Sequence, residues 1–530
     1  MWAWIFSFIR GSSRPNRLAC LSLFAVPFSS RPTTAEFAGQ HRNTPEPDAR
    51  CPPVARPEDL TGTNTRREHD SLGEREVPED AYYGIQTLRA VENFPVSGIM
   101  ARPEFINAYA MVKKAAALAN MEIGWLEPYV AEAIVAACDE ILAGKLHDQF
   151  VVDDFQAGAG TSLNMNINEV VANRALELVG RRKGDYSVIH PNDHVNMSQS
   201  TNDTYPTAMR LCVLIIAQDL LDNLELLRRA FVRKGMEFQT VLKSGRTHLM
   251  DALPVTLGQE FMAYATAIKK ARDQLKSTLK MLEEVPLGAT AVGTGANTHP
   301  DYHRMVVKHL SVITSLNLIE SEDPREALQS RLGVASVSGC MRDLALELIR
   351  ISNDLRLMNS GPTTGLAEIK LPETQPGSSI MPGKVNPVMV ECMNMISFQI
   401  VGNDLAVAMA VQAGQFELNV MNPVMVHNLL ESMVLLNNYL PVFVGKCISG
   451  IEVNEAKCRS YLEKNPSLAT FLQPHIGYER AAEIAKEAIK RNMSIRDLVL
   501  EKGIMTKEQV DAIFDWEFLS GEKKIDNRRK

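Results

Sequence analysis

The sequence predicts a mainly all-α protein built around a bundle of long helices. Residues 259–285 run for 27 positions without Gly or Pro, and their apolar side chains recur every three or four residues. Similar stretches without helix breakers cover 207–233, 340–360 and 388–401, whereas alternating strand patterns are short and rare. The longest stretch would form a rod of about 40 Å. Helices of this length indicate packing against other subunits, because one chain offers few surfaces long enough to bury them.

Length and composition limit the function classes that need to be considered. The chain has 530 residues, enough for about three or four folding units. A content of 45% hydrophobic and 22% charged residues excludes disorder over most of the chain. The net charge of -7 argues against a general nucleic-acid binder, because phosphate backbones select basic surfaces. We therefore expect small solutes as partners.

Eight cysteines lie far apart in the sequence, without a C-x-x-C pair. This spacing favours buried thiols over a zinc or redox site. No window reaches the 18 consecutive apolar residues that a membrane span requires. A soluble protein in a reducing compartment follows as an expectation. The cysteines are Cys20, Cys51, Cys138, Cys212, Cys340, Cys392, Cys447 and Cys458.

The first 60 or so residues differ from the rest of the chain. They hold eight of the 27 prolines and four arginines before position 35, with no acidic residue before Glu36. Transit peptides are basic and poor in acids, but Glu46, Asp48 and two later acidic residues dilute this character. We favour a leader on a cytoplasmic protein, and the alternative is a mitochondrial transit peptide. Residues 1–68 are expected to be a disordered extension.

Changes in helix pattern divide the remaining chain into three expected domains. Residues 69–200 form an N-terminal domain, and 201–455 form the central long-helix bundle. A composition shift near Glu452 opens a small helical domain at 456–530, with helices predicted at 494–502 and 506–514 on either side of Gly503.

The sharpest motif is PGSSIMPGKVNP at 376–387, which precedes an apolar helical run. Asn386 suits a helix N-cap and Pro387 the first helical position, so the free N–H groups should face this loop. Lys384 adds a full positive charge, which makes the loop a candidate anion site. The motif is not a P-loop, because five residues separate Gly377 from Gly383 and no Ser or Thr follows the lysine. The competing interpretation is a flexible loop before a capped helix.

Two further segments place hydroxyl and amide side chains in front of helices. They are SQSTNDTYP at 198–206 and GAGTSLN at 158–164. Each alone is more often a simple helix cap. Three such starts together fit a substrate with two carboxylates, because its recognition needs several neutral donors and one cation in fixed directions.

The segment Gly245–His248 adds a histidine, the side chain whose ordinary pKa lies near neutrality. His248 is either an ordinary polar residue or a group for proton relay or substrate recognition. In the second case Glu391, on the helix after the 376–387 loop, could orient its imidazole. His190 and His194 are expected to be structural, because no third His and no Cys lies near them in the sequence to complete a metal site.

These motifs resemble the class II fumarase and aspartase superfamily. The segment GSSIMPGKVNP is similar to its signature, and matching stretches extend from about Leu72 to Asp515. Within the superfamily, DAYYGIQTLRA at 80–90 and STND at 200–203 look like the aspartase branch, as do LGATA at 287–291 and EIKLP at 368–372. His248 departs from this pattern, because many aspartases carry Gln there and fumarases carry a catalytic His. Fumarase therefore stays the alternative.

The resemblance implies a three-domain fold and a homotetramer whose central helices form one shared bundle. Each active site would then be assembled from three subunits. It implies reversible deamination of L-aspartate to fumarate and ammonia without an organic cofactor or catalytic metal, and it leaves open whether a divalent ion activates the enzyme. A third hypothesis is a catalytically inactive helical scaffold. The presence of Ser378, Lys384 and Thr161 argues against it.

By the same resemblance, Ser378 is the base that removes the C3 proton of the substrate. Four residues would hold the side-chain carboxylate: Thr161, Ser200, Thr201 and Ser379. Three would hold the other carboxylate: Thr247, Lys384 and Asn386. Asn202 and His248 would face the amino group.

Overall fold

The computed structural model describes residues 64–521. The predicted leader, including Cys20 and Cys51, lies outside these residues, so its role stays a prediction. The extension was predicted to be disordered up to residue 68, but Thr65–Asp70 form strand β1, which pairs with β2 (Gly73–Pro78). The reason is the buried Arg66, whose guanidinium donates to the carbonyls of Pro78, Ala81 and Tyr83.

The N-terminal region is a group of helices that ends in one turn of π-helix, η4 (Pro191–Val195). Proline at the first helical position begins two of these helices, since its missing N–H has no partner there in any case. The helices are α1 (Ile85–Asn93), α2 (Pro103–Ile123), α3 (Pro128–Leu142) and α4 (Thr161–Leu178), with short turns η2 (His147–Gln149) and η3 (Gly158–Gly160).

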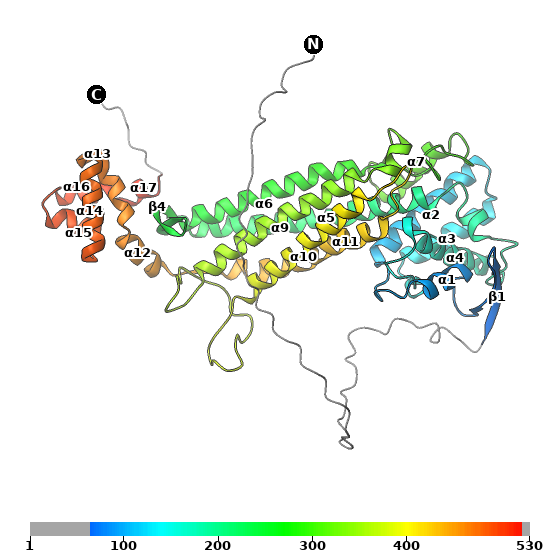
Figure 1. Ribbon diagram of the computed structural model, residues 1–530, viewed down its shortest axis with the longest axis horizontal. Helices are drawn as coiled ribbons and strands as arrows, with labels where there is room; N and C mark the ends of the chain where they lie inside the picture. Colours follow the sequence, from blue (N-terminus) through cyan, green and yellow to red (C-terminus); the bar gives the residue numbers. More distant parts are fainter. Residues whose placement is uncertain (1–63, 522–530) are drawn as a thin grey trace, which may run out of the picture. The chain divides into compact units, whose positions relative to one another are not determined.

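Five long helices run side by side and form the bundle (Figure 1). They are α5 (Thr201–Glu237), α6 (Leu257–Leu279), α9 (Leu332–Met358), α10 (Val388–Gln412) and α11 (Asn422–Lys446). The prediction of long helices here is confirmed. At 37 residues, α5 spans about 55 Å.

Shorter elements connect the bundle helices. Helix α7 (Tyr302–Thr314) packs on α2, and α8 (Pro324–Gln329) precedes α9. Strands β3 (Leu242–Thr247) and β4 (Met250–Thr256) form an antiparallel hairpin between α5 and α6. The remaining short elements are η5 (Lys280–Leu282), β5 (Glu284–Val285), β6 (Ile319–Glu320), β7 (Ile369–Lys370), η6 (Ile448–Gly450) and β8 (Glu452–Val453).

Two of the predicted helix boundaries are wrong for identifiable reasons. The helix expected over 259–285 ends at Leu279, and Glu284–Val285 pair with Ile319–Glu320 instead. Pro286 follows Val285 and disfavours a helical conformation there. Helix α5 begins at Thr201 rather than Thr207, because Ser200 and Asp203 form a capping box that fixes the first turn before Pro206.

The C-terminal residues form a set of small helices with their own apolar cluster from Leu462 to Leu519. The two helices predicted around Gly503 are confirmed as α15 and α16, with Ser494 and Thr506 as N-caps. The elements are α12 (Glu455–Lys464), η7 (Pro466–Leu472), α13 (Gln473–Ile476), α14 (Tyr478–Arg491), α15 (Ile495–Glu501), α16 (Lys507–Ile513) and α17 (Trp516–Leu519).

The cysteines of the described part are free thiols, and five of these six are buried as expected. Cys392 is the exception, since it is half-buried on α10. Among the described helices, α10 alone is long and apolar enough to cross a membrane by length and composition, a test that core helices of soluble proteins also pass. Only 33% of that apolar stretch is buried within the chain.

Gly160 should tolerate no side chain, because it fixes the start of α4 against α5. Its φ is +85°, and an added Cβ would lie 2.0 Å from the ring of Tyr205. We predict that Gly160→Ala lowers the free energy of unfolding by more than about 3 kcal/mol. Gly180 is the matched control, with φ +73° and no atom within 4 Å of its Cβ. Gly180→Ala should cost only about 1 to 2 kcal/mol, the penalty of the left-handed backbone. Equal losses in urea unfolding would contradict the prediction.

The stability of the contact between α11 and the segment before α4 should depend on pH, because it includes His427 of α11. His427 Nδ1 lies 2.8 Å from Asp154 Oδ2, and this hydrogen bond raises the pKa of the imidazole. The folded-state pKa is thus higher than the unfolded value of about 6.5. The ion pair therefore stabilises fully below about pH 6.5, and its contribution is lost as the pH rises through the folded-state pKa. His427→Leu should lower the melting temperature most at low pH. A deficit that is constant from pH 5 to pH 9 would show that the ion pair contributes nothing.

Candidate active site

The start of α5 carries three of the predicted site residues. Ser200 is the N-cap, and its Oγ accepts from the N–H of Asn202 at 3.1 Å. Asp203 returns the contact, since its Oδ1 accepts from the N–H of Ser200 at 3.1 Å. Thr201 and Asn202 occupy the first turn, where helix N–H groups and the positive end of the helix dipole attract anions. Ser200 therefore caps α5, which is one of the two roles that the sequence left open for this segment.

Asp203 also holds the Gly-rich segment after β5 against this helix start. Its Oδ2 accepts from the N–H groups of Gly288 at 3.1 Å and Thr290 at 2.8 Å, while Asn202 Nδ2 donates to the carbonyl of Ala291 at 2.8 Å. Burial raises the pKa of Asp203 to about 7. One fully buried carboxylate therefore fixes both the α5 cap and the neighbouring loop.

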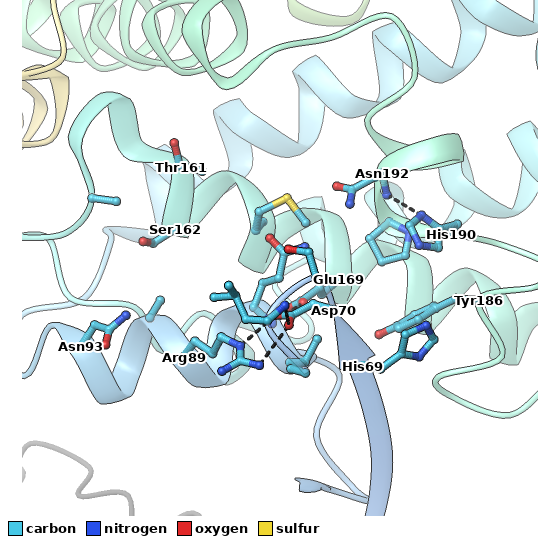
Figure 2. Close-up of a pocket in the computed structure, with 18 of the residues that line it drawn as sticks. His69, Asp70, Arg89, Asn93, Thr161, Ser162, Glu169, Tyr186, His190 and Asn192 are labelled. Carbon is cyan, nitrogen blue, oxygen red and sulfur yellow. Dashed lines mark hydrogen bonds and ion pairs between the residues drawn. The ribbon is translucent and has the colours of Figure 1, made fainter. Parts of the chain in front are cut away.

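The start of α4 lies beside that of α5. Gly160 is its N-cap residue, and the N–H of Ala159 donates to the carbonyl of Val420 at 2.6 Å. Thr161 is exposed and opens onto a cavity of ≈ 740 Å³. Figure 2 shows Thr161 and Ser162 on one side of this cavity and His190 and Asn192 on another. The hydroxyl of Thr161 is therefore available to a ligand.

The charged groups around this cavity are already engaged within the chain. Arg89 forms two hydrogen bonds with Asp70, at 2.8 and 2.9 Å (Figure 2). Glu169 accepts from the backbone of Gly84, Gln86 and Thr87, and burial raises its pKa to about 7. Neutral hydroxyl and amide groups are left to meet a ligand.

His190 and His194 make backbone contacts, as expected for structural residues. His190 Nδ1 accepts from the N–H groups of Asn192 and Asp193 at the start of η4. His194 Nδ1 accepts from the N–H of His190 at 2.7 Å. Among the residues of 64–521, no group of three or more His, Cys, Asp or Glu side chains is placed to hold a metal ion.

The 376–387 loop is closed by hydrogen bonds at its base. The N–H of Gly377 donates to the carbonyl of Lys384 at 2.9 Å, and Asn386 Nδ2 donates to the carbonyl of Gly377 at 2.6 Å. Inside the loop, Ser378 Oγ accepts from the N–H groups of Ile380 at 3.3 Å and Met381 at 3.0 Å. Two N–H donors on one hydroxyl oxygen favour its anionic form.

The predicted helix start after this loop is wrong by one residue. Helix α10 begins at Val388 with Pro387 at the N-cap position, and Asn386 makes no cap hydrogen bond. The reason is that the amide of Asn386 closes the loop through Gly377 instead. Ser379 and Lys384 are exposed, and Lys384 with Asn386 and Glu391 lines a cavity of ≈ 870 Å³. Lys384 forms no ion pair with any described residue.

Thr247 and His248 lie at the tip of the β3–β4 hairpin. His248 and Leu249 have positive φ angles of 56° and 60°, and the tip is exposed. Below it, Arg246 pairs with the buried Glu368 at 2.9 Å, and Lys243 pairs with Glu368 at 2.8 Å. Within the described contacts of one chain, Glu391 forms no hydrogen bond or ion pair with His248, so the suggested pair is not made here.

The structure thus sorts the predicted site residues into three groups. Thr161 lies with Ser200, Thr201 and Asn202, while Thr247 and His248 share the hairpin. Ser378, Ser379, Lys384 and Asn386 share the loop. Helix α5 begins at the first group and leads into the hairpin at its far end, so its length of about 55 Å separates these two groups. The first and second groups therefore cannot meet on one ligand within one chain.

Reasoning from the sequence missed the residues that support these groups from behind. Asp203 could have been found, because Ser200 and Asp203 form an S-x-x-D capping pattern. Asn164 stands at the end of the 158–164 segment but received no role, and Lys113 carried little signal, since it lies in an ordinary helical sequence. Burial lowers the pKa of Lys113 to about 7.

Comparisons with known proteins identify the family of the chain. A family profile described as "Lyase" matches residues 73–402, and one described as "Fumarase C C-terminus" matches residues 468–521. The chain is 52% identical to an aspartate ammonia-lyase of Bacillus subtilis over 450 residues, which cover 85% of this chain and 95% of that protein.

Two solved structures extend the likeness to the fold. A fumarate lyase:delta crystallin from Brucella melitensis is 49% identical with a TM-score of 0.84, covering 86% of this chain and 100% of that one. A class II fumarase from Schistosoma mansoni is 36% identical with a TM-score of 0.84, covering 87% and 100%. The matched profile and these identities show the family: the chain belongs to the fumarase and aspartase superfamily of lyases.

Proposed function

We propose that the chain is an aspartate ammonia-lyase that converts L-aspartate reversibly to fumarate and ammonia. The main support is the 52% identity, over 85% of the chain, to a relative named for that activity. The site chemistry fits as well, because the proposed site residues combine neutral donors with one cation, Lys384, which forms no ion pair with a described residue. Such a site can orient a dianion without binding the ground state too tightly.

The difficult step is removal of a carbon-bound proton next to a carboxylate. A second negative charge then develops on that carboxylate, giving an aci-anion. General base catalysis supplies about 10² to 10⁴-fold, so most of the remaining acceleration must come from preorganised donors around the developing charge. The helix starts of α4 and α5 provide such donors through Thr161, Ser200 and Thr201.

In this proposal Ser378 takes the C3 proton. A serine hydroxyl is normally too weak an acid to act as an alkoxide near pH 7. The N–H groups of Ile380 and Met381 point at Ser378 Oγ, and they would stabilise its anionic form. Ser379 would then join the donors on the side-chain carboxylate.

The remaining residues would fix the other end of the substrate. Lys384, Asn386 and Thr247 would hold the second carboxylate, and Asn202 with His248 would face the amino group. In one chain Asn202 already donates its amide N–H to Ala291, which leaves its carbonyl oxygen to accept from an ammonium group.

Assembly of these groups requires several subunits, and we propose a homotetramer with sites shared by three chains. The outward face of α10 supports it, because large apolar residues repeat along this helix in positions that stay exposed in one chain. They are Met395 (62% exposed), Phe398 (58%), Leu405 (65%) and Met409 (56%). A solution mass near four times 58.8 kDa is expected.

Fumarate hydration is the second candidate, and His248 is the observation that favours it. The two reactions differ in what adds to fumarate. Purified protein incubated with fumarate should yield aspartate only when ammonium is present. Malate formed without ammonium would identify a fumarase instead. No product with or without ammonium would indicate a catalytically inactive scaffold.

Ser378→Ala should lower kcat for aspartate by about 10⁴-fold or more, because the proposed base is removed while the carboxylate-binding residues remain. Binding of succinate, a C4 dianion that cannot react, should stay within about threefold of the parent by calorimetry. Ser187→Ala is the matched control, since among residues 64–521 this exposed hydroxyl bonds only to Asp185. A Ser378→Ala enzyme with parental kcat would rule out the assignment.

A further inference from the structure

A fully buried lysine lies behind the helix starts that form the first group. Lys113 of α2 is 0% exposed, and its Nζ lies 2.8 Å from Asn164 Oδ1, 2.9 Å from Asn196 Oδ1 and 3.0 Å from Gln199 Oε1. These three amide oxygens surround the ammonium group, and no described carboxylate pairs with it within 4.0 Å. Three oxygen acceptors match the three N–H donors of an ammonium group.

Two of these amides have orientations fixed by backbone carbonyls, which can only accept. Gln199 Nε2 donates to the carbonyls of Val195 and Met197, both at 3.0 Å. Asn196 Nδ2 donates to the carbonyl of Gln199 at 3.2 Å. Their oxygens must therefore face Lys113, and the lysine acts as a donor in this cluster.

Asn164 is the third amide, and it connects the lysine to the proposed site. Protonated Lys113 has only donors to offer, so Asn164 presents Oδ1 to it, and Tyr109 donates to the same oxygen at 3.0 Å. The NH₂ group of Asn164 is then left for other acceptors, and Nδ2 donates to Thr201 Oγ1 at 2.9 Å and to Asn196 Oδ1 at 3.3 Å. Asn164 is itself 1% exposed, so water cannot replace these contacts.

The contact with Asn164 decides the direction in which Thr201 can donate. The hydroxyl oxygen of Thr201 accepts from Asn164, so its hydrogen is free for another partner. No described residue accepts that hydrogen, and Thr201 keeps 9% of its surface exposed at the start of α5. An anion at this helix start would receive it.

We propose that Asn164 is a positioning residue whose amide, oriented by Lys113, makes Thr201 a hydrogen-bond donor to the reacting carboxylate. This inference rests on the proposed function, in which Thr201 holds the carboxylate that gains negative charge. A donor fixed in advance needs no reorientation when the charge develops, and loss of one such donor lowers kcat by about 10² to 10³-fold in other enzymes.

The test uses Asn164→Asp, which keeps the shape of the side chain but replaces its NH₂ by a second acceptor. The carboxylate would still accept from Lys113, so the side-chain shape and this contact are preserved, while a negative charge is added beside the lysine. It would also accept from Thr201, which reverses that hydrogen bond and turns the Thr201 hydrogen away from the substrate. We expect kcat for aspartate to fall by about 10² to 10³-fold with the melting temperature unchanged or raised.

Asn164→Ala separates this role from a structural one. Alanine leaves a cavity and deprives Lys113 of one acceptor, so a purely structural residue would suffer more from alanine than from aspartate. The proposed role predicts the reverse order of activity, because in Asn164→Ala the Thr201 hydroxyl can still rotate toward the substrate. An Asn164→Asp enzyme that is as active as the parent, or more active than Asn164→Ala, would overturn the proposal.

A double-mutant cycle with Thr201→Val distinguishes the relay from a charge acting through space. If Asn164 acts through Thr201, adding Asn164→Asp or Asn164→Ala to Thr201→Val should lower kcat by less than about threefold further. A full, additive loss in the Thr201→Val background would refute the relay. Parental activity of Thr201→Val alone would instead refute the proposed site. Failure of both Asn164 variants to fold would show that Asn164 serves folding alone and overturn the inference.

Discussion

The length of α5 is the constraint on which the rest of the structure depends. This helix carries Thr201 at its first position and leads into the hairpin with Thr247 and His248 at its other end. A rigid rod of about 55 Å cannot bring its ends to one ligand of a few ångströms. Any ligand that meets both groups must lie between chains, and the proposed tetramer would use the exposed apolar face of α10.

The electrostatics of the site follow from the same arrangement. The charged side chains around the first group are engaged within the chain. Asp203 and Glu169 accept backbone N–H groups, and Arg89 pairs with Asp70. Hydroxyls and amides are left at the surface of the helix starts, and Lys384 brings a positive charge from the loop. A site of this kind suits a reaction in which negative charge grows on a carboxylate, because neutral donors in fixed positions gain most from that growth.

Much of the fold could be predicted from sequence because it depends on local patterns. The long helices have apolar spacings without breakers, and the caps at Ser200, Ser494 and Thr506 have the side chains that caps require. The errors arose where a tertiary contact decided the outcome. Asn386 closes its own loop instead of capping α10, and Arg66 draws β1 into order through carbonyls more than ten residues away. The proposed site residues stand in motifs, and so does Asn164, but its contact with Lys113 could not be predicted, since Lys113 has no motif and the contact joins two helices.

Mixing two inactive variants tests most directly whether each site is shared between chains. Thr201→Val chains and Ser378→Ala chains should each be inactive alone. The two variants are mixed in equal amounts, unfolded and refolded together. If the two residues reach a site from different chains, about one site in four in the mixed oligomers contains both native side chains, and activity should return to about a quarter of the parental value. If both residues act from the same chain, every site carries one of the two substitutions and the mixture stays inactive, which would contradict the account.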